Sequence, residues 1–376
     1  MRLTARQLNR ATLDRQLLLE RGRLDVVDAV RRVVALQAQE PPSPYVALWN
    51  RIEDFDAREL DTAFATHAVV KASLLRLTLH AVTADDYPVF HSAMLPSLRA
   101  SRLNDRRFRA TGLTTADADA IVAELLEHAG QPRTGVELEA LVTQRFGVLP
   151  KPGGWWALRM FSRVLHHPTG GPWSFGLRPS YVAARHQDRL DHAESVRRLV
   201  ARYLEGFGPA NPLDVSQFTL LGRPLVRTAI KELGDAVVQL EGPDGSVLFD
   251  VPAGTVPDDD VPAPPRLMAM WDSVLLAYAD RSRLIPPDYR RAVIQGNGDV
   301  LPTLLVDGQV AGVWRPVDGG IEATAFHRLP KQAWDGLAGE AAALLAFLAD
   351  REPTIYRRYA RWWATLPEGD VRLLGR

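Results

Sequence analysis

The stretch that begins at Asn211 constrains the fold more than any other part of this chain. Asn211 is a suitable N-cap residue and Pro212 suits the first helical position, so a helix begins there. A Leu-Gly pair ends it, and a second helix with an apolar stripe follows over 224–233. The strand-like stretches 237–240 and 246–249 then flank a Gly-Pro-Asp-Gly turn. Helix, tight turn, helix and two-stranded ribbon is the order of a winged helix-turn-helix.

Two looser copies of this unit precede it. Residues 135–146 and 155–165 are predicted to form two helices, and 166–175, with its Thr-Gly-Gly-Pro turn, the wing. Nearer the N-terminus, 57–65 is predicted to form a helix and 74–82 a strand. The three copies share the pattern but little sequence, and together they predict three modules in tandem.

The character of the chain changes after the acidic, proline-rich stretch 251–265, which we interpret as a linker. Beyond it the sequence predicts short strands, Asp-Gly hairpin turns and a closing amphipathic helix, at 271–278, 300–306, 306–309, 317–320 and 332–349. Short strands joined by such turns are typical of a small antiparallel sheet or barrel.

The length of 376 residues exceeds what one core usually supports, in agreement with several modules. We therefore predict an α+β protein with three tandem winged helix-turn-helix modules and a small antiparallel β-barrel. The expected boundaries are 1–115, 116–190, 191–255 and 266–376.

The charged residues are unevenly spread along the chain. It has 45 basic and 45 acidic residues, so its formal net charge is zero. Residues 1–115 and 151–235 nevertheless carry an excess of positive charge, whereas 116–150 and 236–265 are acidic. The neutral total therefore does not exclude nucleic acid as a partner. Most of the basic residues are arginine, which suits phosphate recognition, although a GC-rich genome produces the same bias without a functional reason.

The absence of cysteine narrows the available chemistry, since it excludes disulfides, thiolate zinc sites and a cysteine nucleophile. His166-His167 has no acidic partner at zinc-ligand spacing, and Asp258-Asp259-Asp260 is best interpreted as a solvated linker. We therefore expect neither a metal nor a cofactor. No apolar run is long enough to span a bilayer and no signal-peptide pattern is present, which favours a cytoplasmic protein without a membrane partner.

Gln37 and Gln39 are the candidate catalytic residues. An apolar helical pattern runs up to them, and Glu40 with the prolines that follow ends it, so we expect both amides at a helix end. Glutamine offers donors and an acceptor, so two fixed amides can hold a water molecule and bind a base or sugar. Because neutral amides are poor general bases, the substrate would need a leaving group that is already activated. The alternative is that both glutamines merely cap the helix. Glu40 either assists or, as we expect, is a solvated acid at the helix end.

The segment Leu36-Gln37-Ala38-Gln39-Glu40-Pro41, followed by Ser43–Trp49, resembles the signature of the AlkZ-type winged-helix DNA glycosylases. That family carries a Gln-apolar-Gln motif at its active site, and a related bacterial branch has Gln-apolar-Asp. Further segments that resemble the family extend over nearly the whole chain, at 77–82, 208–210, 271–276, 280–283, 305–308 and 312–315. The Gln-apolar-Gln form is similar to the branch that confers self-resistance to azinomycin B in an actinomycete.

This resemblance implies three winged helices forming a concave, positively charged DNA cradle, with a small β-barrel attached. It also implies a monofunctional glycosylase that hydrolyses the N-glycosidic bond of N7-alkylated purines, including interstrand crosslinks, and leaves an abasic site. Its partner would be double-stranded alkylated or crosslinked DNA. Alkylation at N7 makes the base a cationic leaving group, so Gln37 and Gln39 would act without a strong base or a metal.

Three further polar residues can be interpreted in two ways. Arg76, Thr78 and His80 alternate along the predicted strand 74–82, so they line either a pocket or the wet side of a sheet.

The remaining candidates are basic. Arg223, Arg227 and Lys231 lie four apart on the second helix of the third module and either contact phosphates or form a solvated face. Arg315, beside Trp314, either probes a DNA groove or is a surface residue next to a core tryptophan.

Two rival interpretations involve no catalysis. The first is a winged-helix DNA-binding protein such as a transcription regulator, and the second is a winged-helix adaptor that binds protein. Regulators usually dimerise to read a site, and this chain shows no heptad repeat or dimerisation helix, so we expect a monomer.

Overall fold

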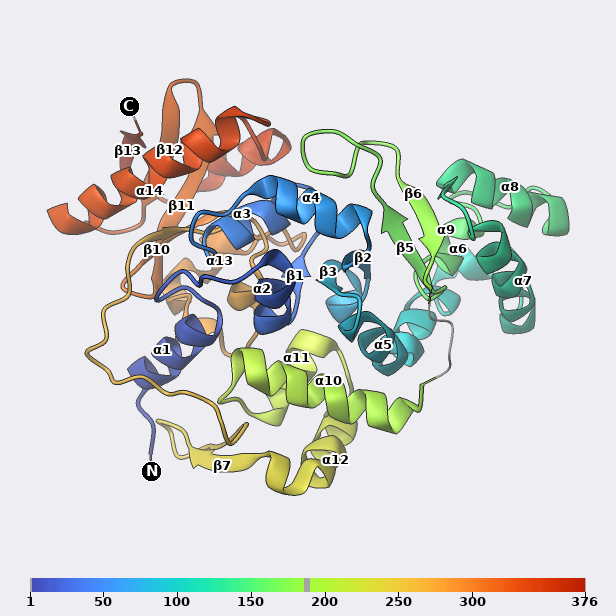
Figure 1. Ribbon diagram of the computed structural model, residues 1–376, viewed down its shortest axis with the longest axis horizontal. Coiled ribbons are helices and arrows are strands. Elements are labelled where there is room, and N and C mark those ends of the chain that lie inside the picture. Colours follow the sequence, from blue (N-terminus) through green and yellow to red (C-terminus); the bar gives the residue numbers. More distant parts are fainter. Residues whose placement is uncertain (1, 186–189, 376) are drawn as a thin grey trace.

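The strands of this computed structural model, which describes residues 2–185 and 190–375, form three antiparallel sheets. The first has six strands in the order β1-β3-β2-β5-β6-β4, with bounds Leu36–Gln37, Leu79–Thr83, Val69–Ser73, Val164–His167, Ser180–Ala183 and Arg133–Thr134. The second has the order β13-β12-β11-β10-β9, with bounds Asp370–Leu374, Gly320–Ala325, Gln309–Val317, Thr303–Val306 and Arg266–Leu267. The third pairs β7 (Val238–Glu241) with β8 (Val247–Asp250). The expected α+β class is confirmed (Figure 1).

Helices surround these sheets. The first half of the chain forms α1 (Ala5–Arg15), α2 (Val26–Val33), α3 (Ser43–Trp49), α4 (Ala57–Ala65), α5 (Asp86–Leu103), α6 (Arg106–Arg109), α7 (Thr115–His128), α8 (Gly135–Phe146) and α9 (Trp155–Leu158). The second half forms α10 (His192–Phe207), α11 (Pro212–Thr219), α12 (Arg223–Leu233), α13 (Arg290–Val293) and α14 (Lys331–Ala349). Short 3-10 helices are η1 (Leu75–Leu77), η2 (Gly234–Ala236), η3 (Ser273–Leu276), η4 (Arg281–Arg283), η5 (Pro287–Tyr289) and η6 (Arg357–Thr365). No helix in the described part of the chain is long and apolar enough to cross a membrane.

The unit that begins at Asn211 folds as its sequence predicts. The Asn211 side chain accepts hydrogen bonds from the backbone of Leu213 and Asp214, and Pro212 occupies the first turn of α11. Helix α12 follows after a short turn, and β7 and β8 form the two-stranded ribbon behind it. Local capping and turn signals specify this unit, which is why the sequence predicts it accurately.

The first two predicted modules share the six-stranded sheet. Strand β2 pairs with β5 through Lys71 and His166, so the sheet continues across the expected boundary at residue 115. The loop between β5 and β6 also returns to the N-terminal helices, where the Trp173 ring lies 5.1 Å from Tyr45 and Phe175 lies 4.9 Å from Phe64. Aromatic packing therefore joins these two parts of the chain.

Three predicted elements are wrong in extent. The helix predicted over 155–165 ends at Leu158, and the chain becomes strand β5 at Val164. The strand predicted over 74–82 is interrupted by η1, in which Arg76 and Leu77 have positive φ angles. The strand predicted over 271–278 is instead largely the 3-10 helix η3. Pairing with the distant strands β2 and β6 decided the first case, and a short sequence window contains no information on such pairing.

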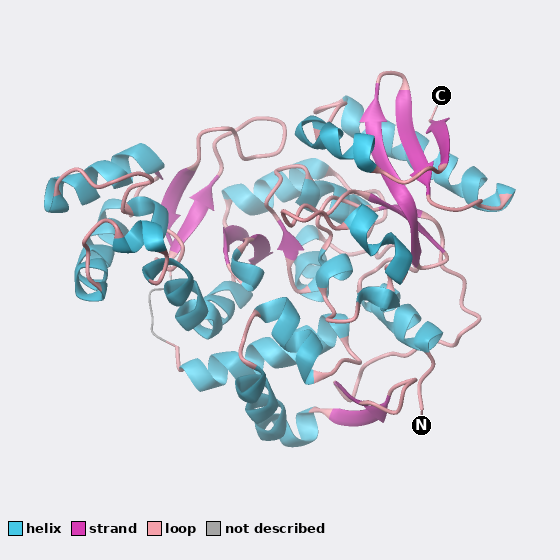
Figure 2. Ribbon diagram, turned by 180° about the vertical axis from the view of Figure 1, so that it is seen from behind, coloured by secondary structure: helices cyan, strands magenta, loops and turns pink. Residues whose placement is uncertain are grey.

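The C-terminal strands form an open sheet rather than the expected barrel. Both Asp-Gly hairpins are present, β10–β11 and β11–β12, but β13 and β9 are the two edges of the described sheet and do not pair with each other. Helix α14 contacts β9, β12 and β13 (Figure 2). Covering the sheet with a helix buries its apolar face without closure.

The predicted linker 251–265 is irregular but is held against α1. The Thr4 hydroxyl donates to Asp259 Oδ1 at 2.5 Å, and the Arg6 Nε donates to the Asp259 carbonyl at 2.5 Å. The Arg10 Nε donates to the carbonyl of Val261 at 2.6 Å. These contacts fix the course of the linker along α1.

Two buried ion pairs tie the N-terminal helices to later parts of the chain. Arg15 donates to both carboxylate oxygens of Asp250, at 2.6 and 2.7 Å. Arg51, which follows α3, donates to both oxygens of Asp272 at 2.8 Å, and neither side chain is exposed by more than 1%. A bidentate pair of this kind fixes both distance and orientation.

We predict that Arg51→Met lowers the free energy of unfolding by about 3–5 kcal/mol, because it leaves the Asp272 carboxylate buried without its counter-ion. Adding Asp272→Asn to this variant should recover most of the loss, since no unpaired charge then remains. Chemical denaturation measures both effects. An Arg51→Met protein as stable as the wild type would show that this pair does not tie the two parts together.

Candidate nucleic-acid site around the two amides

The two amides lie at the edge of the six-stranded sheet and not at a helix end, so that expectation is wrong. Helix α2 ends at Val33, and Val34 turns the chain with a φ of 75°. The chain then pairs with β3, with Leu36 opposite Ala81 and Gln37 opposite His80. The Ala38 N–H continues the ladder by donating to the Leu79 carbonyl at 2.8 Å.

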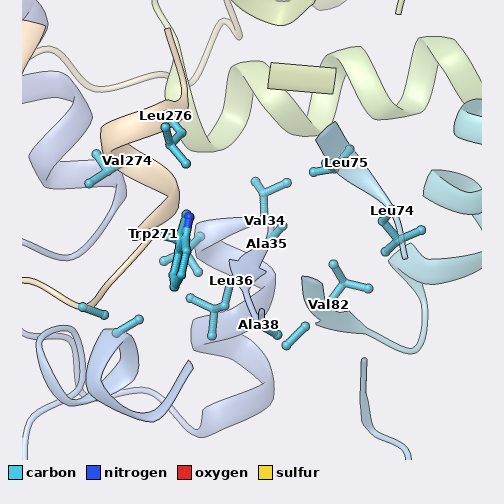
Figure 3. Close-up of a cluster of buried hydrophobic side chains, with 14 of the residues drawn as sticks. Val34, Ala35, Leu36, Ala38, Leu74, Leu75, Val82, Trp271, Val274 and Leu276 are labelled. Carbon is cyan, nitrogen blue, oxygen red and sulfur yellow. The ribbon is translucent and has the colours of Figure 1, made fainter. Parts of the chain in front are cut away.

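Alternation along β1 separates apolar from polar side chains. Leu36 and Ala38 are buried, and Figure 3 shows this segment between Trp271, Val274 and Leu276 on one side and Leu74, Leu75 and Val82 on the other. Successive side chains of an extended strand point to opposite faces, so Gln37 points away from the face of Leu36, and Gln39 follows in the bend after β1. The apolar cluster therefore fixes which way the Gln37 amide points.

The side chains of Gln37 and Gln39 differ in burial and in hydrogen bonding. Gln37 is only 5% exposed, and its Oε1 accepts the backbone N–H of Gln39 at 2.8 Å, which pins the amide group. Gln39 is exposed, and no hydrogen bond holds its side chain in the part of the chain that the structure describes. The site thus combines one fixed amide with one amide that faces solvent.

His80 is the neighbour of Gln37 across the strand pair. Residues directly opposite in an antiparallel pair have their Cβ atoms roughly 5 Å apart, so the two side chains meet. Burial lowers the pKa of His80 to about 4, and the positive charge of Arg76 acts in the same direction. The imidazole is therefore neutral at physiological pH. Its Nδ1 lies 3.1 Å from the Thr78 carbonyl, which can only accept, so Nδ1 carries the proton and Nε2 keeps a lone pair.

The alternation predicted for Arg76, Thr78 and His80 is wrong, because only His80 lies on β3. Arg76 lies in η1 and donates to the Leu276 carbonyl at 3.5 Å, and Thr78 donates to the Leu75 carbonyl at 3.2 Å. His80 is 1% exposed, so it does not lie on the wet side of a sheet.

Glu40 is a buried and paired acid, and the expectation of a solvated one is wrong. It is 8% exposed, and its Oε1 accepts hydrogen bonds from the Tyr359 hydroxyl at 2.8 Å and from the Arg358 guanidinium. Both partners belong to η6, which also places Trp362 Nε1 2.8 Å from Asp299 Oδ2. The sequence did not lead us to expect η6, although its Arg-Arg-Tyr-Ala-Arg-Trp-Trp run is a basic and aromatic signal. The carboxylate nearest the amides is thus occupied.

The predicted DNA-contacting residues lie elsewhere. Arg223, Arg227 and Lys231 are exposed on α12 and form no ion pair within the described residues, so they are available to a ligand. Arg315 is half-buried on β11, where its Nε lies 2.8 Å from Glu322 Oε1, and its neighbour Trp314 is fully buried. Among the described residues, none of these four side chains forms a hydrogen bond or ion pair with Gln37 or Gln39.

A metal-binding constellation is absent from the described ranges, since no three His, Asp or Glu side chains gather at suitable distances. The polar side chains described at this motif are the amides of Gln37 and Gln39, the neutral imidazole of His80 and the paired carboxylate of Glu40.

Comparison with known proteins matches residues 30–347 to the family of AlkZ-like DNA glycosylases. This chain belongs to that family. It is 25% identical over 369 residues to the interstrand DNA cross-link repair glycosylase of Streptomyces sahachiroi, covering 91% of this chain and 96% of that protein.

The fold agrees with this membership. The solved structure of Streptomyces sahachiroi DNA glycosylase AlkZ superposes with a TM-score of 0.80 at 22% sequence identity, covering 94% of this chain and 99% of that one. The AlkZ-like fold therefore holds over nearly the whole chain, and the resemblance stated from the sequence motifs is confirmed.

The neutral state of His80 is directly measurable. We predict that its imidazole keeps the Nδ1–H tautomer and shows no titration between pH 8 and about pH 5, because burial lowers its pKa to about 4. Nitrogen-15 NMR of histidine-labelled protein, with His80→Gln to assign the signal, reads both the tautomer and the midpoint. A midpoint near the ordinary histidine value would contradict this description of the site.

Proposed function

We propose that this protein hydrolyses the N-glycosidic bond of N7-alkylated purines in duplex DNA, including those joined in interstrand crosslinks, and leaves an abasic site. The observation that carries the proposal is the pinned amide of Gln37 beside the exposed amide of Gln39 and the neutral imidazole of His80. Family membership supports glycosylase chemistry, and the name of the Streptomyces relative supports crosslinks as substrates.

The chemistry of the lesion matches this neutral site. An N7-alkylated purine is cationic, so its bond to C1′ breaks with the electron pair moving to the base, and the positive charge passes to the sugar. Water then attacks C1′ and loses a proton. Gln37 and Gln39 can accept hydrogen bonds from that water and fix its lone pair toward C1′, which lowers the barrier through orientation.

His80 gives this site its strongest neutral acceptor. The Nε2 lone pair faces away from the Nδ1–H that Thr78 holds, so it can take a proton from the attacking water or hold it through a hydrogen bond. Glu40, held by Arg358 and Tyr359, is a positioning residue that links the segment after Gln39 to η6. We expect it to hold Gln39 in place without taking the proton.

DNA binding would use the basic residues of the modules. We propose that three winged helix-turn-helix modules form a concave cradle around the duplex, and that the protein acts as a monomer. The exposed Arg223, Arg227 and Lys231 of α12 would contact phosphates. For Arg315, the ion pair with Glu322 would have to open before the guanidinium could reach a groove.

We predict that Gln37→Ala and Gln39→Ala each slow base release by about a hundredfold, because each removes a group that orients the water. The assay incubates excess enzyme with duplex DNA containing 7-methylguanine, and alkali then cleaves the strand at abasic sites. Gln131→Ala, at an exposed glutamine remote from this motif, should retain the wild-type rate.

Absence of abasic product with the wild type would overturn the proposal, as would full activity in both amide variants. The regulator hypothesis predicts instead selective binding to an undamaged sequence without base release.

A further inference from the structure

An arginine cluster surrounds Trp156 and is not part of the site described above. Trp156, on α9, is half-buried, and two guanidinium groups lie over its ring. The Arg102 Cζ, at the end of α5, is 4.5 Å from the ring centroid, and the Arg107 Cζ, on α6, is 4.1 Å away. Three elements that are separate in the sequence therefore build one basic surface.

The cluster contains more positive charge than the carboxylates within reach can balance. Arg107 is paired with Asp105, with Nη2 to Oδ2 at 2.8 Å. The Arg102 side chain forms neither a hydrogen bond nor an ion pair among the described residues, and its Nε is buried without a partner. The pKa of Arg102 is lowered by burial and by the like charges of Arg107 and Arg159. Like charges at this spacing repel one another, so an anion placed between them would reduce the electrostatic repulsion among the guanidinium groups.

Neighbouring residues extend this surface. Arg159, which directly follows α9, donates to the Tyr181 hydroxyl at 3.0 Å and remains exposed. Beside it runs a groove of about 1200 Å³ lined by Trp155, Trp156 and the exposed Leu177. Trp155 is only 4% exposed, and its indole Nε1 has no hydrogen-bond partner in the described part of the chain. Guanidinium groups beside an aromatic and apolar groove suit a sugar-phosphate backbone, which presents anionic oxygens next to apolar deoxyribose carbons.

We propose that Arg102, Arg107 and Arg159 form a phosphate-binding clamp that holds the backbone of the DNA duplex, separate from the residues that release the base. The inference rests on DNA being the substrate, as proposed above. Arginine forks bind phosphate oxygens in two parallel hydrogen bonds, and Arg102 has its fork free. Trp156 keeps both side chains in position by stacking against their guanidinium planes.

The test measures binding of fluorescein-labelled undamaged duplex DNA by fluorescence anisotropy over a range of NaCl concentrations. The double variant Arg102→Ala/Arg107→Ala should bind about tenfold more weakly at low salt. The slope of log K against log salt should fall by about 1.8, the value for two lost phosphate contacts. The matched control is Arg145→Ala, which removes an arginine of α8 that is paired with the carboxylate of Glu124, and it should change neither quantity.

A second variant distinguishes loss of the guanidinium groups from misfolding of the protein. Arg102→Lys/Arg107→Lys keeps the charge but lacks the fork, so it should bind between the wild type and the alanine variant, and circular dichroism should show unchanged thermal unfolding. An unchanged affinity and salt slope in the alanine variant would overturn the clamp, as would an equal loss in Arg145→Ala. Because undamaged DNA is the probe, this result does not depend on base release. Failure of the clamp and failure of the glycosylase proposal are therefore distinguishable.

Discussion

The pairing of β1 with β3 is the constraint on which the arrangement of the site depends. Strand β1 contributes only two residues to the ladder, yet it brings Gln37 opposite His80. It also directs the side chains of Leu36 and Ala38 toward the apolar cluster. A shift of one residue in that pairing would exchange the two faces and send the Gln37 amide into the core. The positive φ of Val34 makes the pairing accessible, because it ends α2 early enough for the chain to extend.

Close packing holds this turn in place. Gly206 of α10 lies so near Val34 that a Cβ there would approach the Val34 Cγ2 to 2.5 Å. The bidentate pair of Arg51 and Asp272 fixes the segment that supplies Trp271 to the cluster around β1. The amides are thus positioned by contacts with residues far away in the sequence, and the site is polar while most of the residues that support it are apolar.

Local signals account for what the sequence predicted well. The N-cap at Asn211 and the Asp-Gly turns at 307–308 and 318–319 act within a few residues, so the third unit and the C-terminal hairpins could be predicted with nearly correct bounds. The motif of Gln37 and Gln39 was also found from the sequence, through its resemblance to a family that the comparisons confirm. The assignment of those two residues to catalysis stays a prediction.

The features that could not be predicted from the sequence depend on contacts between residues far apart in the chain. The partners of Glu40 lie more than 300 positions later in the chain, so its burial was not visible from the residues around it. The same holds for the open C-terminal sheet, since nothing in a strand's sequence tells whether the two edge strands meet. His80 was noted only for its alternation, because its neutral state depends on burial created by the fold.

The central claim is that neutral groups suffice because the leaving base is already cationic. The most direct test compares release of 7-methylguanine with release of uracil and hypoxanthine from otherwise identical duplexes, under single-turnover conditions at neutral pH. We expect release of 7-methylguanine and no detectable release of the two neutral bases. Comparable rates for all three bases would contradict it, since a site without a strong acid cannot activate a neutral leaving group.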